Sequence, residues 1–485
     1  MRGQVKSSKR SSSKRTSAKR TKSSSRAGTS NRKASGTKRV VKKSPVARTS
    51  SAGKTRASSR KASSRKASSR SVSTRKRSTR SSRSGTSSYF RAPTNSGNSK
   101  KSRNSKTSRP KSRRKASLKS TEVGKIQALY LMVLFGGITL FGLIILLSAS
   151  SVSGQYQFGD SLQLFRRQLV WAGLGSIIFV FLSQIDYRIL RKFVPVLVAV
   201  SAILLVLVLI PGMGVNVNGS SRWLSIGPVI IQPAEIAKIA LIIFTAHLLT
   251  LRERRMNRPD LTVRPVMLTF LVFAVLLALQ PKLGTIVVLA FTLMVMMFIG
   301  GTKVRFLFPW VAGGSVGFVL AVLNSSYARE RVEAFLDPMA NQQGIAYQTI
   351  QSQVATANGG ITGVGLGAGR AKYGFLPEVE SDFIFANLAE ETGLIGSTAV
   401  ICFYALISWF GLRAAINAPD RFGMLLATGI TSLIVSQAFL NIGVVLGVVP
   451  TTGVPLPFIS AGGSSLVMML AAAGLLTNVA SRAKT

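Results

Sequence analysis

Long apolar runs fill residues 126 to 485 and constrain the fold more than any other feature of the sequence. Several run for about 18 residues or more with few charges, which is the length that a helix needs to cross a bilayer. We therefore predict an all-α polytopic membrane protein. Its ten predicted transmembrane helices are 126–149, 168–185, 193–210, 235–251, 265–281, 284–301, 306–323, 386–412, 422–446 and 460–480.

Lys and Arg in the short connections predict the orientation of these spans. If the N-terminus lies inside, the inner connections are the basic ones, at 188–192, 252–258, 303–305 and 413–421. The positive-inside rule then places the N-terminus in the cytoplasm, and an even number of spans returns the C-terminus there. The outer connections are 150–167, 211–234, a tight turn near 282, the long loop 324–385 between spans 7 and 8, and 447–459.

The basic residues are concentrated before the first span. Residues 1–120 hold 40 of the 64 Lys and Arg and none of the 15 acidic residues. Like charges repel at this density, and few apolar side chains are present to form a core, so we predict a disordered cytoplasmic tail. It could lie against anionic lipid, bind nucleic acid through counterion release, or act as a transit peptide, which its length disfavours. We divide the chain into this tail, 1–120, and a membrane domain, 121–485.

The chain has one cysteine, Cys402, and one histidine, His247. These counts exclude an internal disulfide and remove most zinc sites and most Cys/His or Ser/His/Asp nucleophile systems. Any chemistry must use carboxylates, Lys, Arg, hydroxyls, the backbone or a borrowed ion.

Five of the 15 acidic residues lie within the 16 positions 376–391, where a polar loop runs into an apolar segment. A carboxylate beside hydrocarbon is costly unless it is paired, protonated or facing a wet cavity, so a functional site is one interpretation. The other is a helix start, with Ser381 or Asp382 as the cap. The same outer loop contains the glycine-rich run 359–369, followed by Arg370 and Lys372, which could contact a phosphate or form a plain flexible loop.

A second cluster of charges lies before and after the fourth span. Glu235 and Lys238 are three residues apart, close enough to pair on one helix face. Arg222 and Lys282 fall on the same outer side. The cations Arg222, Lys238 and Lys282 could therefore form a cavity opposite the carboxylates and receive an anionic substrate from the membrane.

Four groups of motifs, in order, resemble the SEDS family of FtsW, RodA and SpoVE. They are Asn-Gly-Ser-Ser-Arg-Trp at 218–223 with Gln-Pro-Ala-Glu-Ile-Ala-Lys at 232–238, Tyr-Gln-Thr-Ile-Gln-Ser at 347–352, Leu-Pro-Glu through Asp-Phe-Ile-Phe-Ala at 376–386 with Glu390 and Glu391, and 450–465, from Pro-Thr-Thr-Gly to Ala-Gly-Gly-Ser-Ser. The resemblance covers roughly 126 to 482 and leaves out the tail.

The resemblance implies a bacterial cytoplasmic-membrane glycosyltransferase that polymerises lipid II into peptidoglycan on the outer face, for division or for cell shape. It implies Asp382 as the catalytic residue, which we interpret as a general base. Substrate-binding residues are expected at Arg222, Trp223, Glu235, Lys238, Lys282, Glu378, Arg370 and Lys372. A class B penicillin-binding protein and other division or elongation proteins are the implied partners, and magnesium or manganese the implied cation.

The sequence departs from the family pattern at several positions. Lys282 stands where many members have Asp, Glu380-Ser381 replaces a frequent His-Thr, and Ala461 a frequent Tyr. The amino-acid sequence of 450–465 resembles that of FtsW more than that of RodA, although FtsW-type members can have Lys where Thr452 stands.

Two other functions stay open: a lipid II flippase or transporter, and a division-site scaffold that acts through its tail. The outward placement of the ionisable residues favours the enzyme, because a carrier should hold charges near the midplane.

Overall fold

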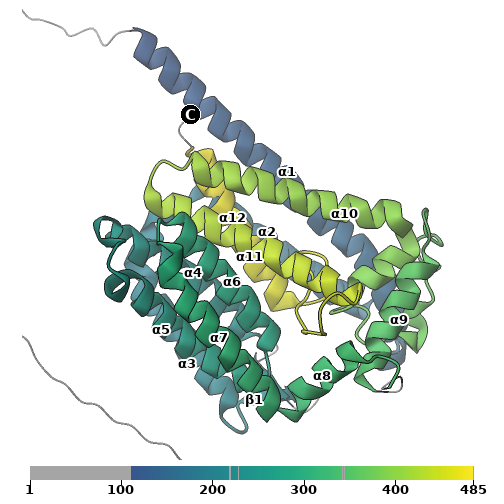
Figure 1. Ribbon diagram of the computed structural model, residues 1–485. Coiled ribbons are helices and arrows are strands. Elements are labelled where there is room, and N and C mark those ends of the chain that lie inside the picture. The colour runs from purple at the N-terminus through teal and green to yellow at the C-terminus, as the bar shows by residue number, and fades with distance from the viewer. Residues whose placement is uncertain (1–110, 218–219, 228, 341, 343, 484–485) are drawn as a thin grey trace, which may run out of the picture. The chain divides into compact units, whose positions relative to one another are not determined.

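A computed structural model (Figure 1) describes residues 111–483 except 218–219, 228, 341 and 343. Residues 1–110 of the predicted tail, and the lipid or nucleic-acid contacts predicted for them, lie outside the described residues. Helix α1 begins at Lys111, inside the segment that we predicted to be disordered. The first candidate membrane span begins at Glu122, and the division of the chain after residue 120 stays a prediction.

Each of the ten predicted spans is an apolar helix. Within the described residues, nine helices are long and apolar enough to cross a membrane, and α6 is a shorter apolar helix of 17 residues. They are α1 (Lys111–Phe158), α2 (Gln163–Gln184), α3 (Leu190–Leu209), α4 (Pro233–Leu251), α5 (Pro259–Ala278), α6 (Leu283–Ile299), α7 (Val304–Asn324), α10 (Ile384–Ile416), α11 (Arg421–Val445) and α12 (Gly463–Ser481).

Helices α4, α11 and α12 are the most buried, and the core of the bundle lies between them. α11 packs against α4, α6, α10 and α12, while α1 and α2 pack against α12. Figure 1 shows α1 and α10 running side by side. Large apolar side chains cover the outer faces of the peripheral helices, above all of α7. Such faces suit contact with lipid, which is as apolar as the side chains themselves.

The predominantly helical fold also contains a small three-stranded antiparallel sheet. Its strands are β1 (Gly214–Val217), β2 (Ser220–Ile226) and β3 (Val229–Ile231), in the order β1-β2-β3. Val215 pairs with Trp223, and Leu224 pairs with Ile231. β-Branched residues on both sides of a Gly-Pro pair are a hairpin signal, but strands this short do not form the long apolar runs that mark a membrane span.

The predicted loop 324–385 also contains regular structure. It holds α8 (Ser326–Leu336), α9 (Ile345–Asn358) and the short π-helix η3 (Ala371–Phe375). Residues 359–365 dock on α10 where Gly393, at φ 66° and ψ −162°, interrupts the helix. There Val364 N donates to Glu390 O (3.0 Å), and Leu394 N donates to Gly360 O (2.9 Å). The break therefore exposes helix backbone groups that the loop satisfies.

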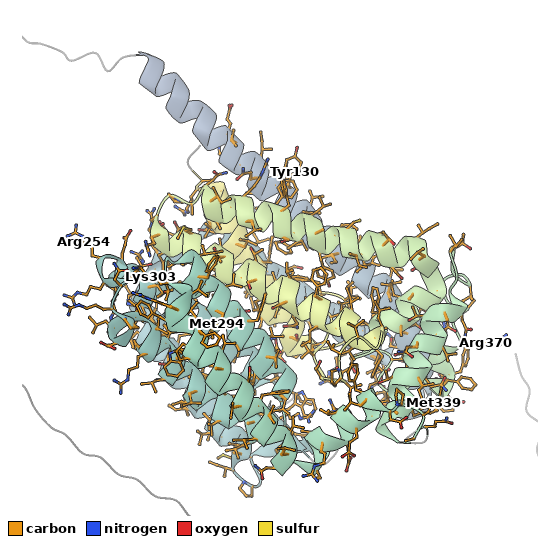
Figure 2. All side chains as sticks on the ribbon, in the orientation of Figure 1. Tyr130, Arg254, Met294, Lys303, Met339 and Arg370 are labelled. Carbon is orange, nitrogen blue, oxygen red and sulfur yellow. The ribbon has the colours of Figure 1, made fainter. Side chains whose placement is uncertain are left out.

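The two ends of the bundle differ in charge. One end, here named the arginine end, holds the short helices η1 (Tyr187–Ile189) and η2 (Glu253–Arg255) and ion pairs such as Arg191–Asp420 at 3.1 Å. The other, the cavity end, holds the sheet, α8 and α9. Figure 2 shows Arg254 and Lys303 at the arginine end and Met339 and Arg370 at the cavity end. The basic connections thus share one end, as the alternation of spans predicted.

Candidate active site

A cavity of about 860 Å³ opens at the cavity end. Its walls come from α2, the sheet, α4, α6, α8, α9, α11 and the segments before α10 and α12. This volume lies in the range of sites that bind small molecules or parts of larger substrates. Seven of the nine predicted site residues line it: Arg222, Trp223, Glu235, Lys238, Lys282, Glu378 and Asp382.

Asp382 reaches the cavity on a short segment that other elements hold by its backbone. Asn441 Nδ2 on α11 donates to Asp382 O (2.8 Å), and Ser460 Oγ donates to Ser381 O (2.6 Å). α10 begins at Ile384 with Phe383 as its N-cap, so neither Ser381 nor Asp382 serves as the cap that we considered. The anchored backbone leaves the Asp382 side chain available to the cavity.

The surroundings of Asp382 favour its protonated form more than water does. Burial and then the nearby Glu378 carboxylate raise the pKa of Asp382, while Arg331, Lys282 and Arg222 oppose the rise. The side chain is only half-buried, because one edge faces the cavity. A carboxylate with a raised pKa in a cleft has the properties of a general base or acid.

Another wall of the cavity is α4, which carries the pair of charges that the sequence predicted. Lys238 Nζ lies 2.8 Å from Glu235 Oε2 and 2.8 Å from Gln437 Oε1, and all three side chains are buried. Ser465 Oγ donates to the same Glu235 oxygen (3.3 Å). Glu235 also lies in the first turn of α4, where the helix dipole favours a negative charge. Removing either partner would leave the other charge buried and uncompensated.

Two further cations meet at the turn before α6. Arg222 Nε donates to Gln280 O (3.2 Å) and Arg222 NH2 to Pro281 O (3.4 Å), so the guanidinium is held against the turn that carries Lys282. Burial lowers the pKa of Lys282 to about 7; Arg222 and Lys238 add to this, and Glu235 and Asp382 oppose it. The site therefore contains a cationic group that titrates near neutral pH.

Several lining residues were not predicted. Arg331 on α8 lines the cavity and donates from NH1 to Thr451 O (2.8 Å), and Arg167 on α2 adds another cation. Gln437 links α4 to Pro455 O (2.9 Å). A buried Gln within an apolar helix is a signal that the sequence offered, because polar groups in a span are costly. Arg331 gave no such signal, since it lies in a segment expected to be a loop.

Arg370 and Lys372, predicted to bind substrate, do not line this cavity. Arg370 is exposed at the edge of the molecule (Figure 2). Lys372 is buried, and its Nζ contacts Glu391 Oε1 (3.0 Å), Ser148 Oγ (2.9 Å) and Gly367 O (2.6 Å). Its charge is therefore used inside the fold.

The glycine-rich run 359–369 packs on α10 and does not line this cavity. A Cβ at Gly359 would lie 2.0 Å from Ala389 O, and one at Gly363 would lie 2.2 Å from Glu391 O. These glycines permit close approach to a helix, and the phosphate contact considered for them stays a prediction.

A divalent cation has no obvious set of protein ligands here. In the part of the chain that the structure describes, no three His, Cys, Asp or Glu side chains are grouped to hold a metal ion. The cation therefore stays a prediction, and the chemistry below uses the chain's own residues.

Fold and site together define a polytopic membrane protein with a charged cavity at one end of its helix bundle. A family model described as "Cell cycle protein" (FtsW, RodA, SpoVE) matches residues 128–485, and the chain belongs to this family. Stage V sporulation protein E of Bacillus subtilis (strain 168) is 42% identical over 340 residues, which cover 70% of this chain and 92% of that protein. The probable peptidoglycan glycosyltransferase FtsW of Geobacter metallireducens is 38% identical over 357 residues, covering 73% and 95%.

Two solved structures are also similar. RodA of Thermus thermophilus has a TM-score of 0.54 and 29% identity, covering 72% of this chain and 95% of that one. A chain from work described as "Structural coordination of polymerization and crosslinking by a peptidoglycan synthase complex" has a TM-score of 0.60 and 30% identity, covering 73% and 97%.

Proposed function

We propose that this protein is a peptidoglycan glycosyltransferase that polymerises lipid II, with Asp382 as its general base. The observation that carries the proposal is the arrangement in one cavity of a half-buried carboxylate with a raised pKa among the cations Arg222, Lys282 and Arg331. Family membership and the relatives named as probable peptidoglycan glycosyltransferases support the reaction class.

The reaction needs a nucleophilic sugar hydroxyl and a lipid-linked pyrophosphate that can leave. Asp382 takes the proton as the hydroxyl oxygen bonds to the anomeric carbon, and the bond from that carbon to the pyrophosphate breaks. A well-placed general base contributes roughly 10²- to 10⁴-fold to the rate. The raised pKa of Asp382 brings its basicity closer to the working pH.

The cations on the other walls stabilise the pyrophosphate as its charge grows. Arg222 is fixed by two carbonyls and Lys238 by Glu235 and Gln437, so neither needs to reorganise during the reaction. Preorganised charges of this kind are usually a major source of rate enhancement. Trp223 and Glu378, at the same cavity, are placed to contact the sugars of the substrate.

We place the cavity end outside the cytoplasmic membrane and both termini inside. The support is the excess of Lys and Arg at the arginine end, which the positive-inside rule assigns to the cytoplasm. A class B penicillin-binding protein is the proposed partner, because a similar chain comes from a complex that couples polymerisation to crosslinking. Other division or elongation proteins are further partners implied by the family.

The test is lipid II polymerisation by the purified full chain, with and without a class B partner. Asp382→Asn keeps the size of the side chain and removes its basicity, so we expect the rate to fall roughly 10²- to 10⁴-fold. Asp160→Asn is the matched control, because Asp160 caps the segment before α2 through Leu162 N (2.9 Å) and does not line the cavity. Normal polymerisation by a correctly inserted Asp382→Asn protein would refute the assignment of the base.

A further inference from the structure

A second, much smaller cavity lies next to Asp382. Its volume is about 10 Å³, close to the least that holds one water molecule. It is lined by Arg331, Gln348, Asp382, Phe383, Asn441, Val444, Thr451, Thr452, Gly453 and Val454. Asp382 thus has the large cavity on one side and a water-sized space on another.

Three oxygen atoms from the walls of this space lack partners. Asn441 Oδ1, Thr451 Oγ1 and Thr452 Oγ1 are buried, and none is hydrogen-bonded to any described residue. The orientation of the Asn441 amide is set by its Nδ2, which donates to both Asp382 O and Val454 O at 2.8 Å. Its Oδ1 is therefore left as an acceptor. Leaving a buried polar atom unsatisfied costs about 1–3 kcal/mol, so three in one place indicate an occupant.

The Asp382 carboxylate packs against the same turn. Gly453, at φ 66°, lines both cavities, and a Cβ built on it would lie 3.5 Å from Asp382 Oδ2. Asp382 Oδ2 thus lies near the turn that joins Thr452 to Val454. A small molecule in the space would be in reach of this carboxylate.

We propose that this space is a binding site for one structural water molecule, held by Asn441, Thr451, Thr452 and Asp382. Water offers two donors and two acceptors. The wall provides two acceptors, Asn441 Oδ1 and the Asp382 carboxylate, and two hydroxyl donors, from Thr451 and Thr452. One water therefore satisfies all three orphaned oxygens and adds a hydrogen bond to the carboxylate.

A metal cation fits this space less well than water. Arg331 lines it and would repel a positive ion. Magnesium also needs near-octahedral oxygen coordination at about 2.0–2.1 Å, for which a space of one water's size with a single carboxylate is poorly suited. Water carries no charge and makes bonds of about 2.7–3.0 Å, which these walls allow.

The water has a role in the reaction if Asp382 is the base, and this step alone rests on the proposed function. A water that donates to the carboxylate stabilises its ionised form. It therefore opposes the effect of burial and keeps Asp382 able to accept a proton at neutral pH. Asn441, Thr451 and Thr452 become positioning residues that act through this water.

The first experiment does not depend on activity. In an experimental structure of the full chain that resolves ordered water, we expect one density peak within about 2.7–3.2 Å of all four groups. We expect the peak to be lost in Thr451→Val/Thr452→Val. An empty space in the wild type, a side chain filling it, or a peak with ligand distances near 2.1 Å that depends on magnesium would each overturn the proposal.

Thermal unfolding supplies a second test, because a dry space and a hydrated space predict changes in Tm of opposite sign for the double variant. If the space were dry, replacing the two unpartnered hydroxyls with methyl groups would raise Tm, because a desolvation cost is removed. With water bound, we expect the double variant to have a lower Tm than the wild type. Thr477→Val is the control, since Thr477 is buried on α12 and donates to Ala473 O at 2.9 Å.

The pH–rate profile then tests the functional step. Loss of the water raises the pKa of Asp382, so the acidic limb of kcat should move to higher pH in Thr451→Val/Thr452→Val. A shift of one unit lowers the rate about tenfold on that limb, while the plateau at higher pH and KM change little. An unchanged profile together with a resolved water would refute the role in catalysis but not the site. If Asp382→Asn remains active, the base assignment fails and the density and Tm results still decide the site.

Discussion

Lys282 lines the cavity and follows the turn whose carbonyl oxygens accept hydrogen bonds from Arg222. Because the pKa of Lys282 is lowered to about 7, the ammonium is charged below that pH and loses its charge as the pH rises above it. An anionic substrate binds the charged form better, so we expect KM for lipid II to rise between about pH 6 and pH 9. A charge-assisted hydrogen bond is worth about 1.5–3 kcal/mol, which corresponds to a rise of roughly tenfold or more.

Two variants isolate this effect in polymerisation assays across that range. Lys282→Arg keeps its charge at every pH, so its KM should stay low and constant. Lys282→Met has no charge, so its KM should be high and equally constant. The charge of residue 282 also influences the pKa of Asp382, so the three proteins are compared by the pH dependence of KM and not by that of kcat. A wild-type KM that does not change with pH would show that Lys282 makes no such contact.

The sequence predicted seven of the cavity residues because each carries a charge or lies in a motif near a span end. Arg370 and Lys372 do not line this cavity, since order along the chain does not show which way a loop turns, and their contact with substrate stays a prediction. Arg370 is exposed, and Lys372 is buried. The orphaned Thr451 and Thr452 hydroxyls were also beyond prediction, because burial of single atoms depends on how three segments pack.

At the scale of elements, the Lys372–Glu391 pair joins η3 to α10. Both side chains are buried, and Ser148 Oγ on α1 also donates to Glu391 (2.6 Å). Lys372→Met leaves Glu391 buried without its counter-ion, and such losses typically cost 3–5 kcal/mol. We expect a markedly lower midpoint in thermal unfolding of the purified protein.

The double variant Lys372→Met/Glu391→Leu removes both charges. It should be more stable than Lys372→Met alone, since no uncompensated ion remains and apolar replacements of buried pairs are often tolerated. Arg370→Met, at the exposed neighbouring cation, should change stability little. Additive destabilisation in the double variant would mean that the pair does not act as a unit.

The ten apolar helices could be predicted from sequence because the bilayer requires a fixed length of apolar chain. The sheet and the helices α8 and α9 could not be found by that criterion, since none of them is an apolar run long enough to span a bilayer. Their positions come from contacts with distant segments: α9 packs on α10, and β3 packs on α12. These elements nevertheless supply Trp223, Arg331 and other walls of the cavity.

At the scale of the whole molecule, the described residues that line the cavity lie between Leu164 and Ser465 and include every catalytic group proposed above. Residues 1–110, which carry most of the excess positive charge, lie outside the described residues. We therefore expect a chain that lacks 1–110 to polymerise lipid II at a rate within about twofold of the full chain, because the catalytic groups are unchanged. Lys111, Arg113, Arg114, Lys115 and Lys119 remain before the first span and keep the positive-inside signal.

This deletion separates the enzyme from a scaffold that acts through its tail. Both proteins should be purified from membranes, assayed with the same class B partner, and compared with Asp382→Asn in each background. An enzyme loses activity through Asp382→Asn and keeps it without the tail. A scaffold shows the reverse in cells: the tail deletion abolishes growth-supporting function and Asp382→Asn leaves it intact. If the truncated protein inserts in the membrane but no longer polymerises, the tail is part of the catalytic unit, and the cavity alone does not account for activity.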